Sequence, residues 1–175
     1  MKILAIDNEG RTHASADSAL VTRSQPWFVP DDGASWLGDV YLAAIVSRLG
    51  KGVAPRFARR YYGQTAIVVH PRPTAPGTPY EWTRDGAILA GEQTAVDPAS
   101  STMAITIGAD TYTTDTATLL RGLDTMLCDI TAHHTVKTGD MLLIPIPGIP
   151  PIPLTRPLTT DILADGTKAM RLKVR

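Results

Sequence analysis

The sequence predicts a β-rich α+β fold, and three observations support that prediction. Short apolar or alternating runs, typical of strands, recur along the whole chain. One long segment, about 116–133, instead places its apolar residues at helical spacing. The 14 glycines and 14 prolines separate these runs with turns. Successive strands with one main helix indicate an α+β architecture rather than an alternating parallel one.

The first half of the chain contains three strand candidates and one short helix. The strands are expected at 2–6, 40–46 and 65–69. The 40–46 run is almost entirely apolar, which predicts a strand covered on both faces. Gly50 and Gly52 end that run, and Pro55 can open a helix over about 55–62 because its missing N–H costs nothing in a first turn. The proline-rich segment 70–79 is expected to be a loop.

The second half contains the main helix between further strands. Strands are expected at 87–90, at 102–107 and at 141–146. A hairpin turn at 108–110 precedes the helix, which Asp115 or Thr116 can cap. The six prolines between 145 and 157 predict an extended, irregular stretch, whose place in the fold the sequence leaves open. A final hairpin turns at Asp165-Gly166.

Composition limits the possible functions. The 175 residues suit a single domain, 1–175. Lys plus Arg and Asp plus Glu each total 17, so net charge gives no argument for nucleic acid or a membrane as partner. One cysteine, Cys128, excludes an internal disulfide. The sequence shows no signal-peptide pattern and no apolar run of membrane-spanning length, so we expect a cytoplasmic protein.

The segment Ser47–Tyr62 contains RLGK, a turn and RFARRYY. This stretch resembles the fumarylacetoacetate hydrolase family, whose members have a similar strand end, turn and helix. Three further passages resemble that family in the same order: 17–31 (DSAL then PWFVPD), 84–91 (RDGAILAG) and 119–140, which ends KTGD. The resemblance implies a mixed β-sheet roll, dimeric or larger. It also implies Mg²⁺- or Mn²⁺-dependent hydrolysis, decarboxylation or isomerisation of acylpyruvates or related 2-oxo acids.

The positions that match the family's metal ligands hold different residues here. The family's Glu-x-Glu pair, which places two carboxylates on one strand face, corresponds to Asp39 and Tyr41. The family's third carboxylate corresponds to His70. Mg²⁺ and Mn²⁺ prefer carboxylate oxygens, whereas imidazole suits Zn, Fe, Ni or Cu. The resemblance therefore implies a degenerate metal site. We expect no cofactor or, failing that, a divalent metal, which would be Mg²⁺ or Mn²⁺ by the family and a transition metal by the residues present.

The substrate positions have also changed. The family's substrate-contacting lysine corresponds to a position near Trp82, and the nearest cation is Arg84. The family's threonine turn corresponds to Ile144–Pro147, and the segments before Asp17 and around 70–79 are shortened. His13 matches the position of a catalytic base in the family, although the residues around it differ.

Two functions follow from this resemblance. The first is a degenerate, non-catalytic relative that acts as a structural, regulatory or ligand-binding protein. The alternative is a diverged metal-dependent hydrolase or isomerase of acylpyruvate or 2-oxo-acid substrates. The expected partner is a second copy of the chain in a dimer, or an active relative, with no nucleic acid and no membrane.

Overall fold

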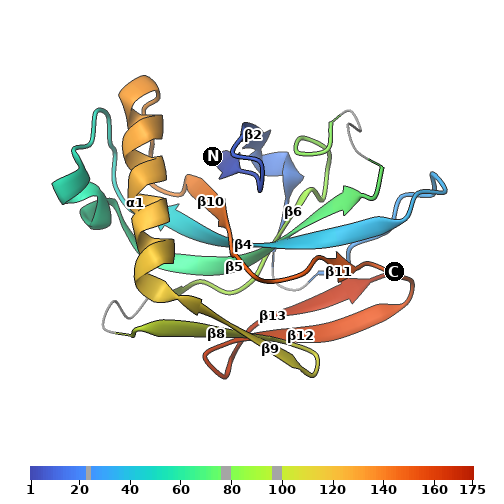
Figure 1. Cartoon of the computed structure of the whole chain (residues 1–175). Coiled ribbons are helices and arrows are strands. Elements are labelled where there is room, and N and C mark those ends of the chain that lie inside the picture. Colours follow the sequence, from blue (N-terminus) through green and yellow to red (C-terminus); the bar gives the residue numbers. More distant parts are fainter. Residues whose placement is uncertain (23–24, 76–79, 96–99) are drawn as a thin grey trace.

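Two β-sheets lie face to face, and one long helix closes an end of the space between them (Figure 1). The computed structural model describes residues 1–22, 25–75, 80–95 and 100–175. Its strands are β1 (Lys2–Ile6), β2 (Thr12–Ala16), β3 (Leu20–Val21), β4 (Trp36–Val46), β5 (Tyr62–Pro73), β6 (Ile88–Ala90), β7 (Thr94–Ala95), β8 (Thr102–Ile107), β9 (Asp110–Asp115), β10 (Met141–Pro145), β11 (Ile152–Pro153), β12 (Leu158–Ala164) and β13 (Thr167–Val174). Its helices are the 3-10 helices η1 (Asp17–Ala19) and η2 (Pro55–Tyr61) and the α-helix α1 (Thr116–His133).

The larger sheet is mixed, and its order is β2-β1-β10-β4-β5-β6-β3. The long antiparallel pair β4 and β5 forms its centre, β11 extends it beside β4, and β7 pairs with β5. The smaller sheet has the order β13-β12-β8-β9 and is antiparallel throughout. This β-rich arrangement is the α+β fold class that the sequence predicts.

The alternation of side chains along β4 creates two cores. Val40, Leu42 and Ala44 point toward the smaller sheet and join the main core. Tyr41 and Ala43 point to the opposite face and belong to a second cluster. Because both faces are covered, the strand is almost entirely apolar, as the sequence analysis expected.

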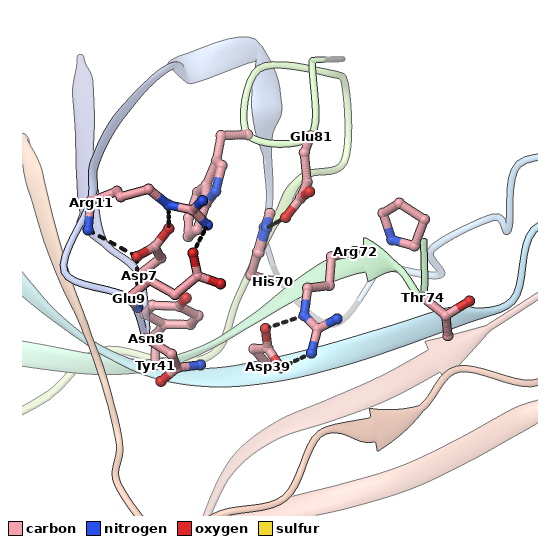
Figure 2. Close-up of a pocket in the computed structure, with 12 residues that line it drawn as sticks. Asp7, Asn8, Glu9, Arg11, Asp39, Tyr41, His70, Arg72, Thr74 and Glu81 are labelled. Atoms are coloured by element: carbon pink, nitrogen blue, oxygen red, sulfur yellow. Dashed lines mark hydrogen bonds and ion pairs between the residues drawn. The ribbon is translucent and has the colours of Figure 1, made fainter. Parts of the chain in front are cut away.

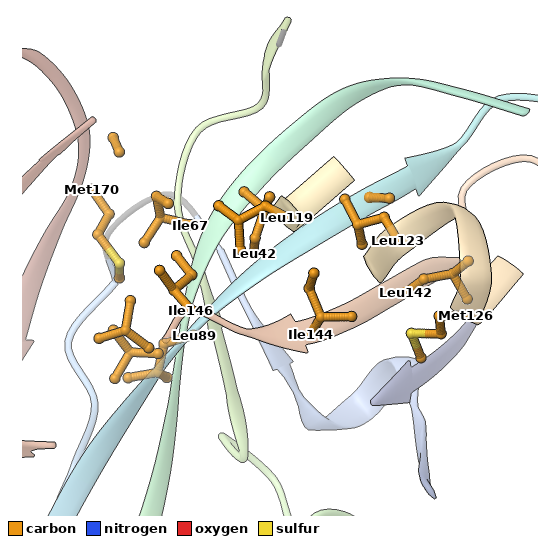
Figure 3. Close-up of a cluster of buried hydrophobic side chains, with 14 of the residues drawn as sticks. Leu42, Ile67, Leu89, Leu119, Leu123, Met126, Leu142, Ile144, Ile146 and Met170 are labelled. Atoms are coloured by element: carbon orange, nitrogen blue, oxygen red, sulfur yellow. The ribbon is translucent and has the colours of Figure 1, made fainter. Parts of the chain in front are cut away.

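Helix α1 packs its apolar stripe into the main core, as Figure 3 shows. Leu119, Leu123 and Met126 are almost completely buried there, beside Leu142 and Ile144 of β10. The helix begins where the Asp115 side chain accepts a hydrogen bond from the backbone N–H of Thr118 at 2.7 Å. The predicted main helix is therefore confirmed, together with one of its two proposed caps.

The predicted short helix is present as η2, in the 3-10 form and with Pro55 at its start. Arg59 of η2 donates to Asp124 of α1, and the Tyr62 hydroxyl donates to the same carboxylate at 2.7 Å. These contacts attach the RFARRYY segment to the main helix.

The expectation that 70–79 is a loop is wrong for its first four residues, because β5 continues to Pro73. Pro71 pairs with Gly38 and Pro73 pairs with Trp36. On that side of β5, the pairing with β7 ends at Thr65 and the pairing with β6 ends at Val69. Beyond Val69, β5 is therefore an edge strand, where a missing N–H is tolerated. Residues 76–79 lie outside the described part of the chain.

The proline-rich segment after β10 runs along the free side of β4. The backbone N–H of Ile146 donates to Val40, and that of Leu154 donates to Trp36. Between them β11 pairs with Leu37 and Gly38. The segment therefore completes the larger sheet next to the residues that precede Asp39.

Candidate functional site

The outer face of β4 and β5, opposite the smaller sheet, brings three of the predicted site residues together. Asp39 and Tyr41 lie two residues apart on β4, and Asp39 is paired in register with His70 of β5. All three side chains share this face because their positions have the same parity as the second apolar cluster. Each residue is buried, at 7%, 1% and 1% exposure respectively.

Asp39 forms an ion pair with Arg72, the next residue of β5 on the same face. Arg72 Nε lies 2.5 Å from one carboxylate oxygen and Nη2 lies 3.4 Å from the other. The Asp39 hydrogen bond raises the pKa of Arg72 above its already high ordinary value. A permanent cation is therefore fixed beside the carboxylate that matches a family metal ligand.

Tyr41 presents a neutral phenol to the same space. Burial, followed by the negative charge of Asp39, raises the pKa of Tyr41 well above its ordinary value of 10. Its hydroxyl forms no hydrogen bond with any described residue. The group is available as a hydrogen-bond donor, but it does not ionise at physiological pH.

His70 is held at both ring nitrogens. Nδ1 lies 2.8 Å from the Ala87 carbonyl oxygen, which can only accept, and Nε2 lies 3.3 Å from Glu81 Oε1. The hydrogen bond from His70 lowers the pKa of the Glu81 carboxyl. The imidazole also stacks on the Trp82 indole, with ring centroids 3.7 Å apart and planes 11° apart.

These residues do not fit a hard divalent cation. The carboxylate of Asp39 is neutralised by Arg72, the phenol of Tyr41 is protonated, and both nitrogens of His70 have partners. Such a cation needs several ionised oxygen ligands in one place. Among the described residues, no cluster of three or more His, Cys, Asp or Glu side chains is arranged to hold a metal ion.

His13 lies on β2 and faces the same region from the other side of Trp82. Its Nε2 is 2.8 Å from Asp7 Oδ2, and its ring stacks on Trp82 at a centroid distance of 4.8 Å. Burial alone would raise the pKa of Asp7, but hydrogen bonds from His13 and Arg11 hold it well below its ordinary value. A carboxylate-oriented imidazole therefore stands at the edge of the site.

The two predicted substrate-binding residues have separate locations. Trp82 lines the site and is 7% exposed. Arg84 instead reaches to the other face of the sheet, where its guanidinium lies over Trp36 and Trp27 at 4.3 and 5.6 Å from the ring centroids. It donates to the Pro71 carbonyl oxygen, and its burial lowers its pKa. Arg84 therefore supports the end of β5 rather than lining the cavity.

Asp39, Tyr41, His70, Arg72 and Trp82 line a cavity of about 370 Å³ (Figure 2), whereas His13 and Arg84 do not. Figure 2 shows Arg72 and Asp39 on one side of it and Arg11 with Asp7 and Glu9 on the other. The sequence analysis missed Asp7, Glu9, Arg11, Arg72 and Glu81 as site residues. One signal could have found Arg72. Residues two apart on a strand share a face, so a strand that continues past His70 through the prolines places the Arg72 side chain beside that of His70.

Comparison with known proteins rests on structure, because no protein-family model and no curated protein matches the sequence. Maleylpyruvate hydrolase from Sphingobium sp. SYK-6 superposes with a TM-score of 0.80 at 21% identity, covering 99% of this chain and 69% of that one. A protein assigned to the fumarylacetoacetate hydrolase family from Yersinia pestis CO92 has a TM-score of 0.80 at 15% identity, with 99% and 92% covered.

An isomerase acting on 2-hydroxyhepta-2,4-diene-1,7-dioate, from Mycobacterium marinum, has a TM-score of 0.81 at 17% identity, with 99% and 73% covered. The Sphingobium hydrolase has also been crystallised in complex with manganese(II) and pyruvate. In the described part of this chain, no helix is long and apolar enough to cross a membrane. The superpositions on these three structures show that the chain has the fold of the fumarylacetoacetate hydrolase family, as its sequence resemblance implied.

Proposed function

We propose that this chain is a degenerate relative of the fumarylacetoacetate hydrolases that binds a small carboxylate without a divalent metal and does not catalyse the family's reactions. The observation that carries this proposal is the ion pair between Arg72 and Asp39. In that position a covalently attached cation takes the electrostatic place of a metal ion. Among structural, regulatory and ligand-binding roles, the cavity of about 370 Å³ favours ligand binding.

The remaining donors suit a carboxylate. Asp39 occupies the edge of the Arg72 guanidinium formed by Nε and Nη2, so the edge formed by Nη1 and Nη2 remains. A carboxylate can accept two parallel hydrogen bonds from such an edge. The Tyr41 hydroxyl adds an unpaired neutral donor on the same wall.

The structural neighbours support the choice of ligand. The Sphingobium hydrolase holds pyruvate together with manganese. A 2-oxo carboxylate is therefore the ligand class to test first, with the guanidinium in place of the metal. The titration should use pyruvate as the probe and EDTA in the buffer.

The test compares Arg72→Gln with Arg121→Gln, a control on the exposed face of α1, by calorimetry in the presence of EDTA. Losing a charged bidentate contact should weaken pyruvate binding at least about tenfold in Arg72→Gln. Arg121→Gln should bind like the unmodified protein. Binding that requires Mn²⁺, or that is unchanged by Arg72→Gln, would overturn the proposal.

One observation favours the alternative, a diverged hydrolase or isomerase. The Asp7 carboxylate orients His13 at 2.8 Å beside the cavity, which is the arrangement of a general base. The hydrogen bond at Nε2 leaves Nδ1 to take a proton from a ligand.

The alternative is tested by incubating the protein with acylpyruvates and oxaloacetate, with Mg²⁺, Mn²⁺ or Zn²⁺ added. Turnover that is lost in both His13→Ala and His70→Ala would establish the alternative in place of the binding protein. No turnover with any of these substrates and metals would exclude it.

A further inference from the structure

Three flat rings are stacked beside the candidate site. The Trp82 indole lies between the imidazoles of His70 and His13, at centroid distances of 3.7 and 4.8 Å. The ring planes differ by 11° and 12°, so the three rings are close to parallel. Trp82 is fixed further by Ser15, whose hydroxyl donates to its carbonyl oxygen.

The stack ends at His13. No other ring of the described chain contacts His13, and its side chain is 25% exposed. His13 lines a second cavity of about 390 Å³, together with Trp82, Tyr80 and Arg11. One face of the imidazole is therefore covered by the indole, while the residue itself borders open space.

The two cavities adjoin. Arg11, Glu81 and Trp82 line both of them. Arg11 is exposed over 64% of its side chain, so it lies at the rim rather than in a sealed partition. A ligand whose carboxylate meets Arg72 in the first cavity therefore needs a linker that passes this rim and the width of the Trp82 and His13 rings before its own ring reaches the second.

Tyr80 stands at the second cavity in a constrained backbone conformation. Its φ is +64°, which is uncommon for an aromatic residue, and its side chain is exposed (79%). The N–H groups of Thr83 and Arg84 both donate to the Tyr80 carbonyl oxygen and fix the turn. The fold thus presents an exposed aromatic side chain where a ligand ring would lie.

We propose that the second cavity is a subsite for a flat aromatic or heteroaromatic ring, which would continue the stack as its fourth member against His13. Parallel offset stacking is a favoured arrangement of such rings. The inference rests on the proposed carboxylate site and narrows its ligand class to carboxylates that carry a ring. A small aliphatic acid would fill only the first cavity.

The experiment compares pyruvate with 2-oxo-6-phenylhexanoate, in which four methylenes separate the ring from the 2-oxo acid, by calorimetry in EDTA. The ring-bearing acid should bind about tenfold more tightly, because stacking and ring burial are added. Tyr80→Ala should reduce this advantage while leaving the affinity for pyruvate close to its original value, and His13→Ala should reduce the advantage as well. Tyr112→Ala, on the distant strand β9, is the control and should change neither affinity.

The outcomes separate the two proposals. Equal binding of the two acids, or an advantage that survives both substitutions, would overturn the ring subsite and leave the carboxylate site in place. If neither acid binds, the proposed function fails and the subsite fails with it. Tyr80→Ala changes an exposed side chain, so it tests the subsite even if His13→Ala impairs folding.

Discussion

Removing Arg72 should destabilise the protein by leaving the Asp39 carboxylate buried without its partner. Breaking a fully buried ion pair costs about 3–5 kcal/mol. The Arg72 side chain is 30% exposed, so water retains part of the solvation. We therefore expect Arg72→Met to lower the free energy of unfolding by about 2 kcal/mol, or the melting temperature by about 4–8 °C.

Two further variants separate the buried charge from general damage. Arg72→Met combined with Asp39→Leu removes both charges and should recover most of the loss, because an apolar pair can replace a buried ion pair. Arg59→Met removes a more exposed ion pair with Asp124, whose side chain is 25% exposed, and should cost at most about 1 kcal/mol. Urea denaturation measures all three variants. A double variant as unstable as the single one would refute the reasoning.

Two other predictions concern acid stability and packing. Burial raises the pKa of the Asp7 carboxyl, but the hydrogen bonds that it accepts from His13 and Arg11 lower it by more. The pKa of Asp7 is therefore lowered in the folded state. Its stabilisation is complete above the unfolded pKa of about 3.9 and is lost as the pH falls toward the folded value, so Asp7→Asn should flatten the decline in unfolding free energy between about pH 5 and pH 3. A Cβ at Gly91 would press against the Ala169 carbonyl oxygen, so Gly91→Ala should cost about 2–3 kcal/mol in urea denaturation. Gly63→Ala, where nothing lies within 4 Å, should stay within about 0.5 kcal/mol, and an equal loss in both variants would contradict the packing argument.

The parts of the fold that the sequence predicted are those with a strong local signal. The main helix follows from leucines such as Leu119 and Leu123 at helical spacing and from a capping Asp115. The 102–107 strand follows from strict alternation and was predicted with its observed bounds. In both cases the local pattern and the tertiary environment favour the same structure.

The prediction of a loop from residue 70 onward was wrong because proline tolerance depends on tertiary context. Pro71 and Pro73 interrupt an ordinary strand pattern, but here they lie where β5 has no partner on one side. That error concealed Arg72, which lies between them and pairs with Asp39. The sequence alone indicates neither the edge nor the pairing.

The aromatic part of the site could be predicted only in part. The resemblance named His13, His70 and Trp82 as separate candidate site residues. It did not predict their stacking, because the 80–87 turn that carries Trp82 between the two imidazoles has no regular pattern in sequence. The partners Asp7 and Glu81 are ordinary charged residues until the fold brings them within hydrogen-bond distance.

The most direct test of the central claim, that Arg72 has replaced a divalent metal, is a measurement of manganese binding by the unmodified protein. A site with a Kd of about 10 µM would stabilise the fold by about 2.7 kcal/mol at 1 mM Mn²⁺, or roughly 5–10 °C in melting temperature. We expect no shift at that concentration and no stoichiometric manganese by elemental analysis after desalting. One manganese ion per chain together with a shift of that size would contradict the account.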